Sequence, residues 1–180
     1  FNMCAYWFTY TWFPGYLKEV KHLSITQSGW WTLAIVAGEI AGYTSFGLFS
    51  DRMGRKPAFT LFAFLMASGL ACIAFAWDFF YAYPALLVAL MIVTGIGTGT
   101  WSNFGPMFAE LYPTHIRNTA LNTIYNLARA TQFGTPLLIG ALAGRYGLVT
   151  GILLGSFFSF AAGAWIWLLP ETRGRIISSD

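Results

Sequence analysis

Residues 29–77 read GWWTLAIVAGEIAGYTSFGLFSDRMGRKPAFTLFAFLMASGLACIAFAW, which is two apolar runs on either side of a short basic turn. Each run has about 20 residues, the length of a helix that crosses the hydrocarbon core of a bilayer. A spanning segment must be helical, because in lipid its backbone groups can bond only to one another. This stretch therefore predicts two membrane helices joined by the basic turn.

The rest of the chain repeats this pattern of apolar runs and short polar connections. Hydrophobic residues make up 57% of the 180 residues and charged residues only 9%, whereas a soluble domain carries about 25% charged residues. A globule of this composition could not cover its surface with charge. We therefore predict an all-α integral membrane protein, a six-helix bundle with spans at residues 1–17, 29–49, 57–77, 82–108, 118–143 and 148–169 and a tail at 170–180.

The basic residues predict an orientation for these spans. Cytoplasmic connections of membrane proteins carry an excess of Lys and Arg. Six basic residues follow spans two, four and six (Arg52, Arg55, Lys56, Arg117, Arg173 and Arg175), and three lie in the other connections (Lys18, Lys21 and Arg145). We expect a multi-pass protein of the plasma membrane, such as a bacterial inner membrane, with both ends cytoplasmic. Because the chain begins with Phe1 inside apolar sequence, we also expect a fragment or a processed chain.

A weak internal repeat divides the chain into two halves. Three residues recur at a constant offset of 93: Gly47, Arg52 and Gly54 correspond to Gly140, Arg145 and Gly147. The two copies end spans two and five, which run in opposite directions through the membrane. This arrangement predicts two inverted three-helix repeats, as in many carriers.

The basic turn is also the most specific motif in the chain. Its basic residues alone would require no more than a positive-inside loop. The full pattern, however, closely resembles the signature loop of the major facilitator superfamily. The resemblance implies a cytoplasmic gate, in which Gly47 lets two helices approach and Asp51 caps a helix N-terminus across the interface between two halves, a contact worth about 0.3–2 kcal/mol. The residues that carry it are Gly47, Asp51, Arg52, Gly54, Arg55 and Lys56.

Two further segments resemble the same superfamily. Residues 110–117, ELYPTHIR, resemble the loop between helices ten and eleven in its sugar- and metabolite-transporting branches, and residues 169–174, LPETRG, resemble the tail after helix twelve. The resemblance covers the whole chain as helices seven to twelve. It implies a missing N-terminal six-helix half, and a charge network that joins Glu110 and Arg117 to the signature loop.

Glu39 and Arg129 place formal charges inside predicted spans. An ionised side chain at the centre of a membrane helix costs about 2.5–3.5 kcal/mol, so such residues face water or a partner. One interpretation is a structural ion pair between the two. The other is functional: Glu39 takes up a proton, and Arg129 binds an anionic substrate group, since its guanidinium presents a fork that matches a carboxylate.

Other residues could complete a substrate site around Arg129. A small-molecule site needs aromatic groups and a few polar ones. Span five offers a polar stripe at helical spacing that ends in the aromatic Phe133, and span four an aromatic and an amide. Span one offers three aromatics, Tyr6, Trp7 and Tyr10, and simple packing is the alternative for each. The candidates are Asn122, Asn126, Trp101, Asn103, Tyr6 and Tyr10.

Several glycines and prolines predict features of helix packing. Pairs at the small-xxx-small spacing allow membrane helices to approach closely. Such pairs are Gly38/Gly42, Gly95/Gly99, Gly140/Gly144 and Gly151/Gly155, and Pro106 and Pro136 are expected to kink spans four and five.

These observations predict secondary active transport of a small organic solute, coupled to protons by alternating access. Arg129 makes a carboxylate the first choice of substrate, and the tail at 170–174 makes a sugar the second. A non-transporting membrane subunit or remnant is the rival class. The sequence contains neither a nucleophile–base arrangement nor a cluster of metal ligands, so neither an enzyme nor a cofactor is expected. The expected partners are the solute, protons and the lipid bilayer; the small, scattered net charge of +3 does not predict nucleic acid.

Overall fold

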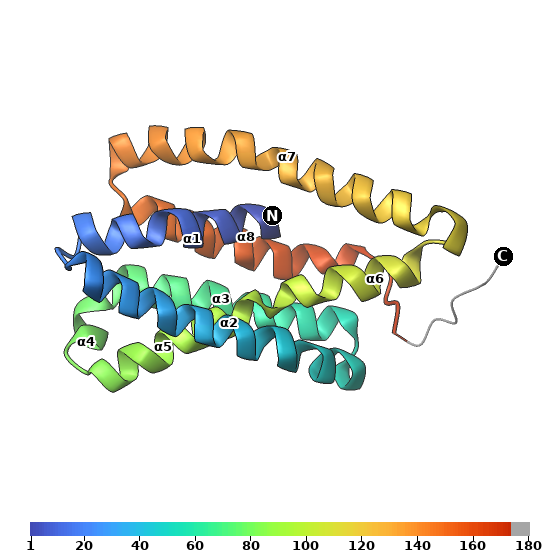
Figure 1. Ribbon diagram of the computed structural model, residues 1–180, viewed down its shortest axis with the longest axis horizontal. Coiled ribbons are helices and arrows are strands. Elements are labelled where there is room, and N and C mark those ends of the chain that lie inside the picture. Colours follow the sequence, from blue (N-terminus) through green and yellow to red (C-terminus); the bar gives the residue numbers. More distant parts are fainter. Residues whose placement is uncertain (174–180) are drawn as a thin grey trace.

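The chain folds into helices that run mostly along one long axis (Figure 1). The computed structural model describes residues 1–173, apart from the side chains of Phe8, Gln132 and Ile139, and these residues form helices and no strand. The predicted all-α fold is thus confirmed, while residues 174–180 of the predicted tail, with Arg175, lie outside the described residues. The elements are α1 (Asn2–Glu19), α2 (Ile25–Met53), α3 (Arg55–Phe75), α4 (Trp77–Tyr81), α5 (Pro84–Ile96), η1 (Gly97–Asn103), α6 (Phe104–Leu111), α7 (Thr114–Tyr146), α8 (Val149–Trp165) and η2 (Ile166–Leu168).

Four of the helical rods are long and apolar enough to cross a membrane. They are Ile25–Met53, Arg55–Phe75, Pro84–Leu111, which joins α5, η1 and α6, and Val149–Leu168. The other two predicted spans correspond to α1 and α7, of 18 and 33 residues. At 1.5 Å per residue these helices extend about 27 Å and 50 Å, so length permits both to span. Their composition is more polar, and their membrane crossing stays a prediction.

The rod Pro84–Leu111 corresponds to the fourth predicted span, and we call it the fourth rod. It changes its helix type before Pro106. Residues Gly97–Asn103 form a 3-10 helix, and the α-helix resumes at Phe104. Proline has no N–H, and its ring crowds the carbonyl four residues earlier, so Pro106 disfavours a regular α-helix in the turn before it. Pro136 lies inside a continuous α7.

Glycines allow α2 to pack directly against the fourth rod. A Cβ added at Gly38 would lie 2.1 Å from the carbonyl oxygen of Ile92, and one at Gly95 would lie 2.0 Å from the carbonyl oxygen of Ile35. These backbones touch, as the small-xxx-small spacing predicted. The same expectation is wrong for α7, because added Cβ atoms at Gly140 and Gly144 would meet nothing within 4 Å among the described residues.

The internal repeat of the sequence has a structural counterpart. Gly54 ends α2 with φ 104°, and Gly147 ends α7 with φ 82°. Positive φ values disfavour side chains with a Cβ, so both positions favour glycine. The two glycines, 93 residues apart, therefore serve the same purpose at the ends of two helices.

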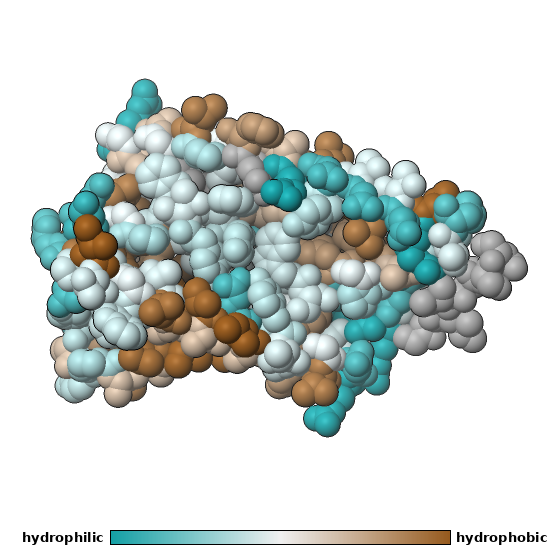
Figure 2. Space-filling view, in the orientation of Figure 1, coloured by the Kyte–Doolittle hydropathy of each residue, from teal (hydrophilic) through white to brown (hydrophobic). Residues whose placement is uncertain are grey.

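Many large hydrophobic side chains are exposed, as expected of a lipid-facing surface. Figure 2 shows hydrophobic patches along the lower edge and scattered over α7, among residues of intermediate hydropathy, with strongly hydrophilic side chains gathered toward the ends of the long axis and along part of α7. Leu127, Phe133 and Leu137 of α7 are 72%, 85% and 77% exposed. Exposure of such residues in water would be unfavourable, whereas acyl chains would cover them. Phe133 therefore does not close the polar stripe of span five over a cavity.

Candidate functional site

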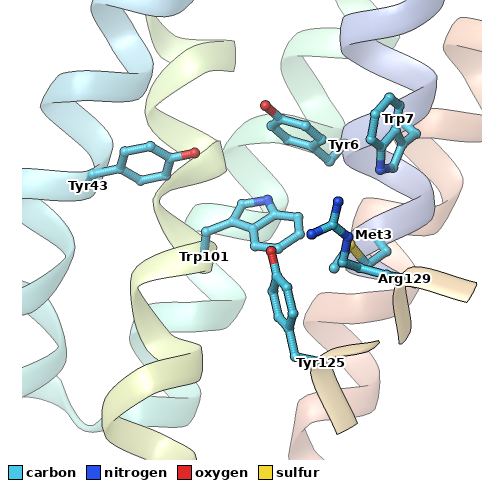
Figure 3. Close-up of a pocket in the computed structure, with 7 residues that line it drawn as sticks. All are labelled: Met3, Tyr6, Trp7, Tyr43, Trp101, Tyr125 and Arg129. Atoms are coloured by element: carbon cyan, nitrogen blue, oxygen red, sulfur yellow. The ribbon is translucent and has the colours of Figure 1, made fainter. Parts of the chain in front are cut away.

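An open cavity lies between α1, α2, η1 and α7. Its volume is about 270 Å³, and five of its seven lining residues are aromatic. Figure 3 shows the hydroxyl of Tyr43 and the guanidinium of Arg129 pointing into the space beside the Trp101 indole. The lining residues are Met3, Tyr6, Trp7, Tyr43, Trp101, Tyr125 and Arg129. Four residues that the sequence offered for the site thus lie together: Arg129, Trp101, Tyr6 and Trp7.

Ring contacts hold the aromatic wall in place. The Tyr6 ring meets the Trp101 ring edge-on, with centroids 5.3 Å apart, and stacks on Tyr10 at 4.5 Å. The Trp101 ring also meets the edge of the Tyr125 ring at 6.5 Å. Such pairs add about 0.5–1.5 kcal/mol each to ordinary burial. The wall therefore joins α1, η1 and α7 without using the polar groups that a ligand would need.

Arg129 has an aromatic neighbour and forms no ion pair among the described residues. Its guanidinium carbon lies 5.7 Å from the centroid of the Tyr125 ring, one helical turn away on α7. The ion pairs among the described residues involve only Lys21 and Arg55 as cations. The ion pair between Glu39 and Arg129, one of the two interpretations of the sequence, is therefore not formed in the described part of the chain.

Glu39 binds a tyrosine instead. The hydroxyl of Tyr43, one turn further along α2, donates a hydrogen bond to Oε1 of Glu39. The Tyr10 hydroxyl also lies close to the same carboxyl, although no hydrogen bond of full geometry forms there among the described residues. Because Tyr43 also lines the cavity, it connects the carboxyl of Glu39 to the space beside Arg129.

The three predicted amides lie outside the cavity lining. Asn122 and Asn126 are exposed on α7, and their side chains donate to the carbonyl oxygens of Asn118 and Asn122, each at 2.8 Å. Asn103 is buried, and its amide nitrogen lies 3.3 Å from the sulfur of Met107 while its oxygen has no partner among the described residues. Their roles in binding stay predictions.

Sequence reasoning missed Met3, Tyr43 and Tyr125 as cavity residues. A usable signal existed for two of them, because Tyr43 lies four residues after Glu39 and Tyr125 four residues before Arg129. Residues four apart are neighbours on a helix face. A tyrosine one turn from each intramembrane charge was therefore a sign that both pairs face the same cavity.

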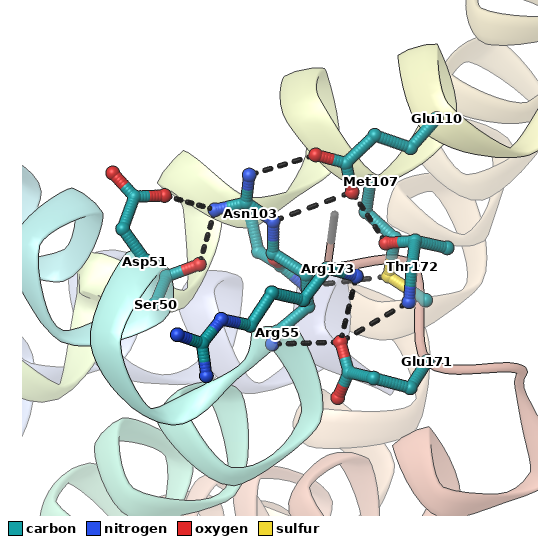
Figure 4. A network of polar contacts seen from close by, with 9 residues as sticks. All are labelled: Ser50, Asp51, Arg55, Asn103, Met107, Glu110, Glu171, Thr172 and Arg173. Carbon is teal, nitrogen blue, oxygen red and sulfur yellow. Dashed lines mark hydrogen bonds and ion pairs between the residues drawn. The ribbon is translucent and has the colours of Figure 1, made fainter. Parts of the chain in front are cut away.

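A second polar site lies at the end of the bundle that carries the basic turn of residues 52–56, which we call the basic end. Arg55 is its centre (Figure 4). Its guanidinium binds both carboxylate oxygens of Glu110, at 2.7 and 3.3 Å, and also donates to Asp51 at 2.9 Å and to Ser50 at 2.6 Å. A two-pronged pair of this kind fixes geometry as well as charge. The start of α3 is thereby tied to the ends of α2 and α6.

Glu171 completes the network from the tail. Its carboxylate accepts hydrogen bonds from the backbone N–H groups of Arg55, Lys56, Thr172 and Arg173, at 2.9–3.2 Å, and so caps α3. Partial burial opposes ionisation of this carboxyl, but the four donors stabilise its charged form, and the net effect lowers the pKa of Glu171. The hydroxyl of Thr172 donates to Glu110, which links the tail to Arg55 as well.

The remaining residues of the predicted gate lie outside this network. An added Cβ at Gly47 would meet nothing within 4 Å, and Arg52 is exposed. Arg117 donates to Thr114 at 3.3 Å and forms no ion pair within residues 1–173. The charge network implied by the resemblance thus holds Glu110 and Arg55 but not Arg117, and the gating role of all these residues stays a prediction.

Comparison with known proteins agrees with the fold. The sequence model of the Major Facilitator Superfamily matches residues 1–178. A Haemophilus influenzae protein named for metabolite transport is 32% identical over 92% of this chain and 40% of its own length. A cis,cis-muconate transport protein from Acinetobacter baylyi is 26% identical over 88% of this chain and 38% of its own, and a D-xylose transporter from Levilactobacillus brevis is 28% identical over 86% and 29%. The chain thus spans less than half the length of these relatives, which are transporters and not enzymes. It belongs to the Major Facilitator Superfamily.

Proposed function

We propose that this chain forms half of a carrier for a small organic anion, in which Arg129 binds a carboxylate and Glu39 carries a proton. The observation that supports the substrate class is the position of Arg129, which points into an aromatic cavity and forms no ion pair within residues 1–173 (Figure 3). Guanidinium binds carboxylate through two parallel hydrogen bonds. The muconate carrier among the relatives has a substrate of this class.

A second wall of the site would come from outside this chain. The cavity of about 270 Å³ is slightly smaller than most small-molecule sites, which enclose about 300–1,000 Å³, and it is open. Carriers built from repeats bind their substrate between the two halves, near the middle of the bilayer. We infer that a further six-helix half covers the cavity and that rocking of the halves gives alternating access. Both ends of this chain would then be cytoplasmic.

Tyr43 would couple the proton to the substrate. With Glu39 ionised, the Tyr43 hydroxyl donates to the carboxylate. Once Glu39 takes up a proton, its carboxyl no longer requires this donor, and the hydroxyl is free to donate to a substrate oxygen in the cavity. Proton uptake and substrate binding would thus favour each other, as symport requires.

The test is a set of three variants in the complete carrier. Arg129→Lys keeps the charge but loses the fork, so we expect at least tenfold weaker binding of a carboxylate substrate. Glu39→Gln should abolish uphill transport yet permit exchange of substrate down its gradient. Tyr43→Phe should weaken proton coupling while leaving Arg129 in place. Unchanged affinity in Arg129→Lys, or proton-driven accumulation in Glu39→Gln, would contradict the assignment.

The ion-pair interpretation predicts a different outcome. In that case either single neutralisation would leave an unpaired buried charge, and Glu39→Gln/Arg129→Gln would restore stability. In the structure, however, Glu39 binds Tyr43, and Arg129 lies on Tyr125. We therefore expect the effects of Glu39→Gln and Arg129→Gln on thermal stability to be additive.

A sugar is the second candidate substrate. The D-xylose carrier among the relatives and the tail at residues 170–174 favour it. Inhibition of uptake by a panel of carboxylates and neutral sugars distinguishes the two candidates, because a site built around Arg129 should discriminate against uncharged compounds.

A further inference from the structure

A groove between α3 and α8 is separate from the cavity. It is formed by one face of α3 from Phe64 to Ala71 and one face of α8 from Leu153 to Phe160, and its volume is about 470 Å³. None of these residues lines the aromatic cavity. The two helices pack closely and run antiparallel, so the groove follows the direction in which acyl chains run in a bilayer.

The groove is apolar although two serines line it. Ser156 donates its hydroxyl hydrogen to the carbonyl oxygen of Ala67 at 2.7 Å, and Ser68 donates to that of Leu65 at 3.1 Å. Neither hydroxyl proton is left for a ligand. At the side nearer the basic end, the rings of Phe64 and Phe160 stack with centroids 4.9 Å apart and planes 6° from parallel. Such a surface suits a flexible hydrocarbon and offers no donor to a polar solute.

A cation lies on the same stripe of α3. Lys56, Thr60, Phe64, Ser68 and Ala71 are three or four residues apart, so they follow one face of the helix. Over the 15 residues from Lys56 to Ala71 the helix extends about 22 Å, and the groove begins about 12 Å from Lys56. Half a bilayer, headgroups included, is about 20–22 Å deep. The groove, about 12–22 Å from Lys56, therefore lies at the depth of the distal half of an acyl chain whose headgroup is at Lys56.

The ammonium of Lys56 is held in position but not neutralised. It donates to the carbonyl oxygen of Trp167 at 3.3 Å and lies 5.7 Å from the centroid of that ring. The Trp167 indole in turn donates to Thr60 at 2.9 Å. No carboxylate within residues 1–173 pairs with Lys56, since Glu171 binds its backbone N–H and three others. An ammonium has three donors, so two remain for phosphate oxygens.

From this juxtaposition we infer that the groove binds one acyl chain of an anionic glycerophospholipid, whose phosphate is bound by Lys56 beside Trp167. Tryptophan is enriched at the headgroup level of membranes, because it combines an apolar ring with a polar N–H. The charge of Lys56 selects an anionic headgroup, and the groove selects a lipid over a free phosphate. The inference does not depend on the transported substrate.

The test uses two photoreactive lipids with the same diazirine-bearing acyl chain, a phosphatidylglycerol and a phosphatidylcholine. The protein, expressed with its natural flanking sequence, is reconstituted with each, and the cross-linked residues are mapped by mass spectrometry. We expect phosphatidylglycerol to label residues 64–71 and 153–160 more strongly than phosphatidylcholine. Lys56→Gln should reduce the phosphatidylglycerol signal about fivefold and leave the phosphatidylcholine signal unchanged, since one lysine near an anionic surface contributes about that factor.

A second variant tests the groove itself. Ala71→Phe places a ring in the groove and should reduce labelling by both lipids, whereas Ala89→Phe on the exposed surface of α5 is the matched control and should not. Equal labelling by the two lipids, labelling that is indifferent to Ala71→Phe, or cross-links between two copies of the protein through this groove would each overturn the inference.

Discussion

Replacement of Gly95 by alanine tests the contact that positions Glu39. The added Cβ would lie 2.0 Å from the carbonyl oxygen of Ile35 and 2.9 Å from the backbone nitrogen of Glu39, whereas an ordinary van der Waals contact begins at 3.4 Å. Because both neighbours are backbone atoms, α2 and the fourth rod must separate by about 1.4 Å (3.4 minus 2.0). Overpacking of this kind costs about 3 kcal/mol, and the higher helix propensity of alanine offsets about 1 kcal/mol.

The expected net loss is therefore about 2 kcal/mol, or about thirtyfold in the ratio of folded to unfolded protein. Thermal unfolding of the purified protein in detergent, followed by circular dichroism, would measure it. Gly140→Ala is the matched control, since its Cβ would meet nothing within 4 Å. Transport should also fall in Gly95→Ala, because separation of the two helices moves Glu39 and Tyr43 together away from the cavity wall at Trp101. Equal stability of the two variants would refute the close approach of α2 and α5.

Three further predictions concern the basic end and the orientation. Asp51→Asn in the complete carrier should impair transport while leaving membrane insertion nearly intact, because it removes an exposed charge and no apolar contact; unchanged transport rates would contradict a gating role. Glu171→Gln should destabilise the protein by about 0.5–1 kcal/mol at pH 7. Since the pKa of Glu171 is lowered, its stabilisation is fully present above the unfolded value of about 4.3 and is lost as the pH falls through the folded value, so the wild type and the variant should converge in acid. Single cysteines at Met53 and Ile25, exposed residues at opposite ends of α2, should react with an impermeant reagent from the cytoplasmic and the outer side respectively; reaction of both positions from the same side would overturn the topology.

The sequence was sufficient for the helices but not for the contacts between them. Apolar runs of the length of a bilayer located every rod to within a few residues, because lipid imposes helix on any spanning segment. Small-xxx-small spacing marked Gly38, Gly95 and Gly140 alike, yet only the first two meet a neighbouring backbone. The spacing makes a helix surface smooth; which smooth surfaces meet depends on the arrangement of the whole bundle.

The same limit applies to the polar residues. The resemblance placed Glu110 in a network with the signature loop, but no pattern in the sequence indicated that Glu171 would cap α3 from 115 or 116 residues away. For α7, helical spacing grouped Asn126 with Arg129. Three residues correspond to about 300° around the helix, so the two side chains point about 60° apart, and the amide binds its own helix rather than lining the cavity.

The acidic residues explain why Arg129 and Arg55 have different roles. The chain has seven Asp and Glu residues. Asp51 and Glu110 bind Arg55, Asp78 binds Lys21, Glu171 caps α3, and Glu39 binds Tyr43. Glu19 ends α1 near Lys18, far along the helix from the cavity residues at its start, and Asp180 lies outside the described residues.

Arg55 is thus neutralised by its own chain and can fix the packing of three helices. Arg129 has no such acid among residues 1–173, and an arginine beside an aromatic cavity remains charged at every physiological pH. Arg129 faces an open cavity, where water or an anion from elsewhere can stabilise its charge. Under our proposal that anion is the substrate, which makes the energetic cost of the uncompensated charge the source of substrate affinity.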